Sequence, residues 1–305
     1  MSFELTIYIP IFNQPEKLIK CLHSLRSQTF KKFKVFIVDD NSTLEYINLL
    51  KEYQDLEIKY TKNENRLGAF SNILNCLHLH CDTSYRMVLH EDDILSPQWL
   101  EYSLQAFNIQ QDNVAWVGCE MDFFSTYDEV KFESVENLPY YISNNFKLLV
   151  KKTVTGSPLS FSSIIYNNSK LQNFQFSFNK YSVLGDRIFL FELGKEYGFI
   201  YFQNKFISVY DHSKEDNRWN DLRFQHIIDY FIYLRSILTR KDLDDKLIKY
   251  FIMKSLREKI KFLKNVTLFQ KFKIVMSLFS NDMFFLKYYL LTNKVFRKMS
   301  DFILN

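Results

Sequence analysis

Short apolar runs alternate with amphipathic segments along the first 120 residues. Continuous runs such as Phe33–Val38 are typical of strands buried on both faces. Between the runs, leucines recur every three or four residues, as at Leu18, Leu22 and Leu25, which places them on one helix face. The pattern predicts strands at Leu5–Ile9, Phe33–Val38, Glu57–Tyr60, Tyr85–Leu89 and Val114–Cys119, and helices at Gln14–Gln28, Leu67–His80 and Pro97–Phe107.

This alternation indicates βαβ units and therefore a mainly parallel central sheet with flanking helices, an α/β fold. A further helix is expected after Asn41 or Ser42, since either side chain can cap one. In parallel sheets, ligands bind beyond the carboxyl ends of the strands. Residues that follow the predicted strands are therefore the first candidates for a site.

The pattern is weaker between residues 120 and 210 and becomes helical afterwards. It predicts a helix at Phe146–Lys152, a strand at Leu159–Tyr166, a helix at Leu184–Gly194 that Gly194 caps, and a strand at Phe199–Tyr210. From Leu222 onward, apolar residues at helical spacing are separated by lysines. We expect an α/β domain at 1–221, with halves at 1–120 and 121–221, and an amphipathic α-helical extension at 222–305.

Composition excludes several classes of protein. With six glycines and five prolines, the chain lacks the Gly-rich loops that cradle phosphates, and it has no low-complexity tract. Its four cysteines form no C-x-x-C pair, which favours reduced core residues and a cytoplasmic location. The first residues run directly into a strand and no uncharged apolar run approaches about 18 residues, so neither a signal peptide nor a spanning helix is expected.

Charge is unevenly placed along the chain. The net charge is +4, but residues 235–305 carry 16 lysines and arginines against 6 acids, which leaves −6 on the first 234 residues. Such a basic extension can be a solvated outer face of packed helices, or it can bind an anionic membrane surface. No nucleic-acid recognition motif accompanies it, and the rest of the chain is acidic, so nucleic acid is not expected as a partner.

Two acidic clusters follow predicted strands. Asp39-Asp40 comes after the second strand and Glu91-Asp92-Asp93 after the fourth, so both should face the same crevice. Clustered carboxylates repel one another unless a cation compensates, and Mg²⁺ typically takes one or two of them together with substrate phosphate oxygens. The alternative is that these acids are solvated loop residues or helix caps.

Three segments together resemble the inverting family 2 glycosyltransferases, which have the GT-A fold. They are "TIYIPIFNQPEKLIKCLHSLRSQTFKKFKVFIVDDNST" at 6–43, "NRLGAFSN" at 65–72 and "VLHEDDILSPQWLE" at 88–101. Many matched positions in order make the resemblance specific, and it extends over about residues 4–212. It implies a GT-A fold and a sugar transferase of the kind that builds bacterial surface glycans or lipid-linked oligosaccharides.

The resemblance also implies roles for individual residues. Contacts with the nucleotide are expected from Pro10, Phe12, Asn13, Asp39, Asp40, Arg66, Gly68, Asn72, Glu91 and Asp92. The family's Asp-x-Asp motif falls on 90–92, with Asp92 as the main ligand of Mn²⁺ or Mg²⁺ and Asp93 as the following acid. His90 replaces the motif's first Asp, which leaves open whether it binds the metal. His212 is expected near the diphosphate and is counted with the metal ligands.

The second half should supply the acceptor side. In "FNKYSVLGDRIFLFELG" at 178–194, the family's Glu-Asp falls on Gly185-Asp186, so Asp186 remains as the catalytic base. Alternatively, Asp186 only caps the helix that follows. Ser157, Arg187 and Trp219 are expected to contact the acceptor, although Trp219 is also compatible with a core or lid position.

The sequence therefore predicts a metal-dependent inverting transferase, peripheral on the inner face of the cell membrane. It would move a hexose or N-acetylhexosamine from a UDP-sugar to a hydroxyl of a glycan acceptor, which we expect to be lipid-linked. A sugar-phosphate nucleotidyltransferase would need a Gly-rich loop after the first strand, which "PIFNQPEK" lacks. A non-catalytic sugar-nucleotide-binding or scaffold protein remains the alternative, because His90 and Gly185 depart from the family pattern.

Overall fold

The computed structural model describes residues 3–110, 114–132, 137–139, 141–146, 148–149, 159–178 and 185–210. The chain divides into two units. The first is composed of residues 1–153, 157–176 and 189–215, and the second of residues 154–156, 177–188 and 216–305. The predicted helical extension at 222–305 lies outside the described residues.

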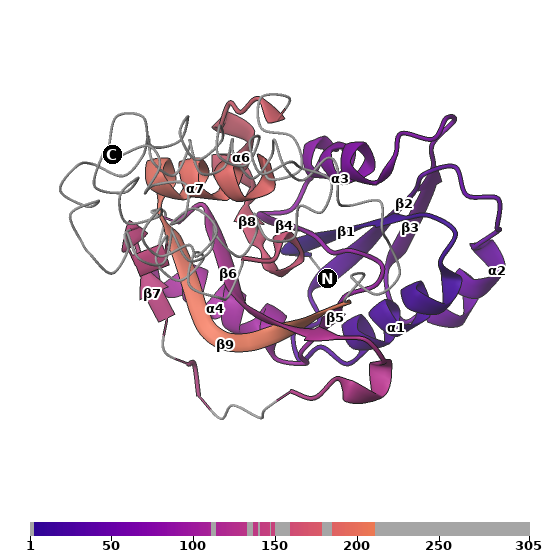
Figure 1. Ribbon diagram of the computed structural model, residues 1–305, viewed down its shortest axis with the longest axis horizontal. Helices are drawn as coiled ribbons and strands as arrows, with labels where there is room; N and C mark the ends of the chain where they lie inside the picture. The colour runs from indigo at the N-terminus through magenta and orange to yellow at the C-terminus, as the bar shows by residue number, and fades with distance from the viewer. Residues whose placement is uncertain are drawn as a thin grey trace, which may run out of the picture. The chain divides into compact units, whose positions relative to one another are not determined.

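One mixed sheet organises the first unit (Figure 1). Its strands are β1 (Leu5–Ile11), β2 (Phe33–Asp39), β3 (Ile58–Lys62), β4 (Tyr85–Val88), β5 (Ile94–Leu95), β6 (Trp116–Phe124), β7 (Tyr141–Ser143), β8 (Ile165–Asn167) and β9 (Phe199–Tyr210). Within the described part of the chain, the order is β3-β2-β1-β4-β8-β6-β9-β5, with β7 beside β9. β1 to β4, β6 and β9 point the same way, whereas β5, β7 and β8 are antiparallel to their neighbours. This confirms the predicted mainly parallel sheet.

Helices cover both faces of the sheet (Figure 1). They are α1 (Pro15–Arg26), α2 (Ile47–Leu50), α3 (Ala69–His78), α4 (Trp99–Gln110), α6 (Asn168–Asn173) and α7 (Gly185–Tyr197), with short 3₁₀ helices η1 (Lys51–Tyr53), η2 (Tyr127–Glu129) and η3 (Phe161–Ser163). Alternate residues of β1, Leu5, Ile7 and Ile9, share a buried core with the apolar faces of α1 and α4. On the opposite face, Trp116 of β6 donates from Nε1 to the Leu190 carbonyl of α7 at 2.9 Å.

The strand order indicates where a ligand crevice is expected at one edge of this sheet. The chain runs outward from β1 to β2 and β3 and then crosses to β4 on the other side of β1, so the strand order reverses between β1 and β4. Such a reversal separates the loops at the carboxyl ends of the two strands and is where open α/β sheets bind ligands. The Asp-Asp and Glu-Asp-Asp clusters both follow strands at this edge.

Several predicted elements differ in the structure. No helix begins at Ser42, because Asn41 has a left-handed φ of 61° and Ser42 Oγ accepts from the Asn13 N–H instead of capping a helix; α2 starts only at Ile47. Of the predicted strand at Leu159–Tyr166, Ile165 and Tyr166 lie in the short β8, whereas Phe161–Ser163 form η3. Gly194 lies inside α7 beside the Trp116 ring, and the left-handed residue after the helix is Gly198, with φ of 85°. β5 and β7 were not predicted.

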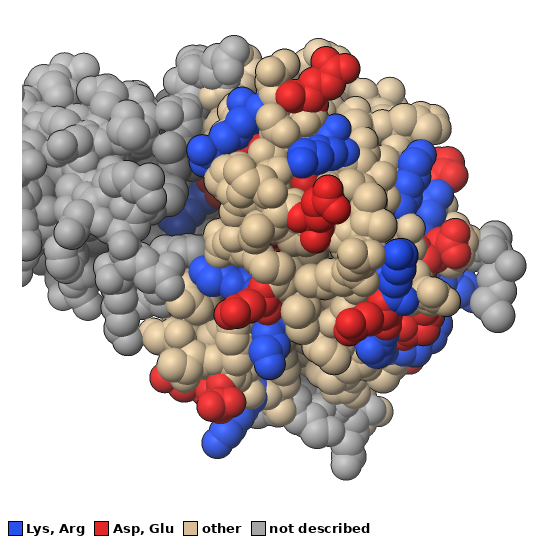
Figure 2. Space-filling model, turned by 90° about the vertical axis from the view of Figure 1, so that its right-hand side faces the viewer, with Lys and Arg blue, Asp and Glu red and all other residues tan. Residues whose placement is uncertain are grey.

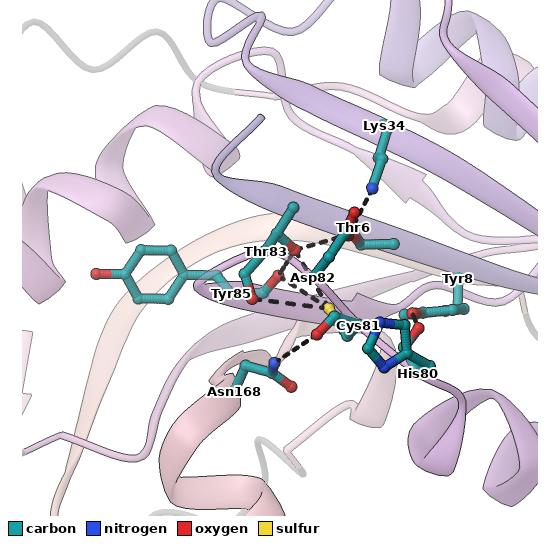
Figure 3. A network of polar contacts seen from close by, with 9 residues as sticks. All are labelled: Thr6, Tyr8, Lys34, His80, Cys81, Asp82, Thr83, Tyr85 and Asn168. Atoms are coloured by element: carbon teal, nitrogen blue, oxygen red, sulfur yellow. Dashed lines mark hydrogen bonds and ion pairs between the residues drawn. The ribbon is translucent and has the colours of Figure 1, made fainter. Parts of the chain in front are cut away.

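A polar network closes the opposite, amino-terminal edge of the sheet (Figure 3). The Thr6 and Thr83 hydroxyls lie 2.8 Å apart, and Asn168 Nδ2 donates to the Cys81 carbonyl at 3.1 Å. Asn168 Oδ1 also accepts a 2.8 Å bond from Nε of Arg86, whose side chain is only 2% exposed. Asn168 thus satisfies a buried cation and a buried carbonyl together.

The four cysteines are buried and free, as predicted. A search of the described residues for a long, apolar helix able to cross a membrane finds none.

Replacing Asn168 by alanine should lower the free energy of unfolding by about 2–3 kcal/mol, because a charged donor and a carbonyl each lose a buried partner. Urea unfolding of the purified chain measures this change. Asn173→Ala, at an exposed position of the same helix, is the matched control and should change stability by less than about 0.5 kcal/mol. Equal effects of the two substitutions would show that the network contributes little.

Candidate functional site

The site begins where β1 ends. Asn13 has φ of 54°, in the left-handed region that asparagine tolerates better than most residues. Its backbone N–H donates to Ser42 Oγ at 3.0 Å, and its side-chain oxygen accepts from the Thr43 backbone N–H at 2.9 Å. Asn13 therefore ties the loop after β1 to the loop after β2. This turn presents Phe12 at the crevice.

Asp39, the last residue of β2, and Asp40 are almost completely buried, and each accepts hydrogen bonds from backbone N–H groups. Asp39 accepts from the Ser42 N–H at 2.9 Å and from the Tyr60 hydroxyl at 2.6 Å. Asp40 accepts from the backbone N–H groups of Leu67 and Gly68 at 2.7 and 2.8 Å. The two carboxylates thus hold the loops after β2 and β3 in place. Their expected contact with the nucleotide stays a prediction.

The 65–72 segment brings a positive charge to β1. Gly68 has φ of 88°, which few other residues adopt, and this turn precedes α3. The exposed guanidinium of Arg66 lies over the Phe12 ring, 3.9 Å from its centroid. The Asn72 side chain is buried, donates to the Val38 carbonyl at 3.0 Å and accepts from Asn63 Nδ2 at 3.1 Å. Of the residues predicted in this segment, Arg66 is the exposed one.

The acids after β4 lie in a tight turn. His90, Glu91 and Asp93 each form a hydrogen bond with a different segment of the chain. Glu91 Oε1 accepts from the Phe12 backbone N–H at 2.9 Å, which bridges the ends of β1 and β4. Asp93 Oδ1 accepts from the Tyr210 N–H at 3.2 Å, at the end of β9. The His90 N–H donates to Ser162 Oγ at 3.1 Å. Three separate segments therefore meet at this turn.

His90, Asp92 and Asp93 bring three ligand atoms together. These atoms all lie within 4.8 Å of one another, and His90 Nδ1 is 3.6 Å from Asp93 Oδ2. Ligands about 2.1 Å from a metal lie at most about 4.2 Å apart, so small side-chain movements suffice to bind one ion. One imidazole and two carboxylates suit a divalent transition metal such as Mn²⁺, as well as Mg²⁺ with a water. The residues present therefore fit the predicted metal.

Glu91 lies beside this group and is only 8% exposed. Burial raises the pKa of its carboxyl to about 8, and the nearby charge of Asp92 contributes to the rise. Its Oε2 atom is buried without a hydrogen-bond partner among the residues that the structure describes. An added cation would favour the ionised form of this carboxyl.

Three residues near the acids were not predicted from the sequence: Lys17, Tyr127 and Tyr210. The Lys17 ammonium, on the first turn of α1, lies 3.8 Å from the centroid of the Tyr210 ring. Tyr127 of η2 packs near Tyr210, with ring centroids 6.4 Å apart. Burial raises the pKa of Tyr127, and the charge of Asp92 adds to this effect. The position of Tyr127 depends on β6 reaching Phe124, five residues beyond its predicted end.

Asp186 lies in the first turn of α7, which begins at Gly185. Its Oδ1 accepts from the Arg187 backbone N–H at 2.7 Å, and burial raises the pKa of the carboxyl. The Asp186 side chain therefore bonds to the backbone of its own helix. Both Asp186 and Arg187 are half-buried. The other predicted residues of this half, Ser157, His212 and Trp219, lie outside the described residues.

The amino-acid sequence matches a known protein family. The family model described as Glycosyl transferase family 2 matches residues 6–173. The chain is 24% identical over 228 residues to the bifunctional glycosyltransferase pgtA of Dictyostelium discoideum, a match that covers 73% of this chain and 27% of that protein. The chain thus spans about a quarter of the length of this relative.

Two solved structures share the fold. TarS 1-349 of S. aureus in complex with UDP-GlcNAc superposes with a TM-score of 0.58 at 14% identity, over 91% of this chain and 81% of that one. The mannosyltransferase PcManGT from Pyrobaculum calidifontis, in complex with GDP-Man and Mn2+, has a TM-score of 0.57 at 12% identity, over 99% and 84% of the two chains. Together with the sheet order, these similarities confirm the predicted GT-A fold.

Glu91→Gln should change how stability depends on pH. Since the pKa of about 8 in the folded protein exceeds the usual value near 4.3, the folded chain keeps a proton that the unfolded chain loses between these values. The free energy of unfolding should therefore fall as pH rises from 5 to 8, by up to about 1 kcal/mol per unit, and Glu91→Gln should flatten this slope. Urea unfolding with chelator present measures it.

The exposed Glu64→Gln is the control for this experiment and should keep the slope of the unchanged protein. Parallel pH profiles for the unchanged protein and Glu91→Gln would contradict the raised pKa.

Proposed function

The chain belongs to glycosyl transferase family 2, and we propose that it is a metal-dependent inverting glycosyltransferase that uses a UDP-sugar. The observation that carries this proposal is the convergence of His90, Asp92 and Asp93 at the end of β4, where the strand order reverses. A divalent ion in this position would neutralise the charge of the leaving diphosphate.

The residues around the acids would bind and orient the donor. Phe12, held through its N–H by Glu91, and the Arg66 guanidinium above it form one side of the crevice. Arg66 carries a fixed positive charge that suits a phosphate. Asp39 and Asp40 would then set the loops against which the base and ribose lie.

A UDP-linked hexose or N-acetylhexosamine is the proposed donor, with glucose, galactose and their N-acetyl forms as candidates. The UDP-GlcNAc complex of TarS supports a uridine nucleotide, whereas the GDP-Man complex of PcManGT belongs to a structure of the same fold with a different base. The imidazole of His90 favours Mn²⁺ over Mg²⁺, since nitrogen ligands bind the transition metal better.

Asp186 is the proposed catalytic base. As the acceptor hydroxyl oxygen forms its bond to the anomeric carbon, its proton would pass to the Asp186 carboxylate. The bond between that carbon and the diphosphate oxygen breaks on the opposite face, which inverts the configuration and releases UDP. A pKa raised by burial makes this carboxylate a better proton acceptor than an exposed aspartate.

The acceptor is proposed to be a surface glycan or its lipid-linked precursor, assembled at the inner face of the cell membrane. On the face shown in Figure 2, basic and acidic side chains are interspersed, so no basic patch is seen there. We propose that attachment to an anionic membrane uses the net charge of +10 between residues 235 and 305, from 16 basic and 6 acidic residues.

Gly185 in place of the family's glutamate, and His90 in place of its first aspartate, favour one other function: a non-catalytic protein that binds sugar nucleotides. Binding and turnover must therefore be tested separately.

UDP with Mn²⁺ should raise the unfolding temperature of the chain by several degrees, since a ligand at 100 times its Kd stabilises by about 2.7 kcal/mol. Thermal unfolding with UDP, UDP-sugars, GDP and TDP, with and without chelator, measures the shift. Asp92→Asn should abolish it. Asp82→Asn, in an exposed ion pair with Lys34 at the other edge of the sheet, should not (Figure 3). No shift with any nucleotide would overturn the proposal.

Asp186→Asn should lower kcat by about 10²–10⁴-fold while the shift with UDP persists, because only the proton acceptor is lost. Release of UDP from the active UDP-sugar measures turnover. Glu196→Gln changes an exposed acid on the same helix and should leave kcat within a factor of two or so. Unchanged turnover in Asp186→Asn would remove this residue from the mechanism.

A further inference from the structure

β9 contains an irregularity that its neighbour β6 lacks. The register pairs Cys119 with Phe202, Glu120 with Lys205 and Met121 with Ile207, so three residues of β9 have no partner on β6. These are Gln203, Asn204 and Phe206. A bulge of this kind redirects side chains out of the regular alternation and is common beside binding sites.

A polar cavity of about 310 Å³ lies at this bulge. The segment that follows η2 passes along the outer side of the curved β9 and contributes to the lining (Figure 1). The cavity is lined by Asp122, Lys131, Phe132, Gln203, Asn204, Lys205, Phe206 and Ser208. Its size suits a ligand of about one sugar ring rather than a nucleotide.

The cavity offers hydrogen-bonding groups that the protein itself does not use. Lys205 pairs with Asp122 at 3.1 Å. In contrast, Gln203, Asn204 and Lys131 make no side-chain hydrogen bond or ion pair within the described part of the chain. The same holds for Ser208, although its side chain is only 3% exposed. The Ser208 hydroxyl and the half-buried amides of Gln203 and Asn204 are therefore available to hydrogen-bond a ligand that enters the cavity.

The chemistry of these groups indicates a carbohydrate. Each amide combines donors and an acceptor, the hydroxyl can do either, and the Lys131 ammonium is a donor, which together match the neighbouring hydroxyls of a pyranose. Phe132 supplies one apolar surface against which the C–H groups of the ring can lie. Most pockets for other small molecules are predominantly apolar, which this one is not.

The cavity lies along the strand that leads to the metal-ligand group. Ser208 pairs with Asp122 two residues before the end of β9, where the Tyr210 N–H donates to Asp93. Two residues of a strand span about 7 Å, so the nearer end of the cavity is within reach of a glycan that extends from the acidic site. We propose that this cavity binds a sugar unit of the acceptor other than the one that receives the transferred sugar. This inference rests on the proposed function.

Saturation-transfer NMR on the full chain tests the proposal, with UDP and Mg²⁺ present to occupy the donor site without paramagnetic broadening. The probes are the methyl glycosides of glucose, galactose and N-acetylglucosamine, each up to about 10 mM because a single sugar binds weakly. At least one glycoside should bind while UDP is bound. Gln203→Ala and Lys131→Ala should each weaken its binding about fivefold or more, as expected for a lost hydrogen bond.

Gln172→Ala and Lys195→Ala replace exposed residues of the same types outside the cavity and should leave glycoside binding unchanged. If UDP binds but no glycoside does, or if Gln203→Ala binds the glycoside as well as the unchanged protein, the cavity proposal is overturned and the transferase proposal stands. Failure of UDP itself to bind with either Mg²⁺ or Mn²⁺ would instead count against the transferase.

Discussion

Buried carboxylates that accept hydrogen bonds from the backbone of other loops hold this site together. A carboxylate removed from water is costly unless donors surround it, so each acid at the edge of the sheet must recruit N–H groups from the chain nearby. The recruited groups come from the loops after β1, β2 and β3 and from the last residue of β9: Phe12 N–H to Glu91, Ser42 N–H to Asp39, Leu67 and Gly68 N–H to Asp40, and Tyr210 N–H to Asp93. The acids thus act as structural anchors before they meet any ligand.

This constraint explains which parts of the fold could be predicted. Most elements of the first 110 residues follow from local patterns, since each of these strands and helices buries its own apolar run against the sheet. β5 has only Ile94 and Leu95, and it exists because they pair with Ser208 and Ile207 more than 110 residues away. No local pattern could indicate it. The helix expected at Ser42 fails for a similar reason, because the Ser42 hydroxyl that would cap it accepts from the Asn13 N–H, 29 residues away in the chain.

The candidate site was predictable in its residue types but not in its bonding. The sequence placed Asp92, Asp93 and His90 together, and their ligand atoms do converge. It could not distinguish residues that face a ligand from those that face the protein: Asn72 was expected at the nucleotide, yet its side chain holds Val38. Tyr127 was missed because its place depends on how far β6 continues, which is decided by pairing with β9.

β9 connects these observations, because one strand carries both the bulge and the bond to Asp93. Its register near the site is held from both sides, by Ile94 of β5 and Asp122 of β6, which both pair with Ser208. Slipping a strand by one residue would turn every side chain to the other face, so this double pairing fixes where Tyr210 and the cavity residues point. The spacing between Gln203 and Tyr210 is therefore set by the sheet and not by flexible loops. A glycan that occupies the cavity would meet the acids at a fixed distance, so acceptor length could be selected by the number of residues in this strand.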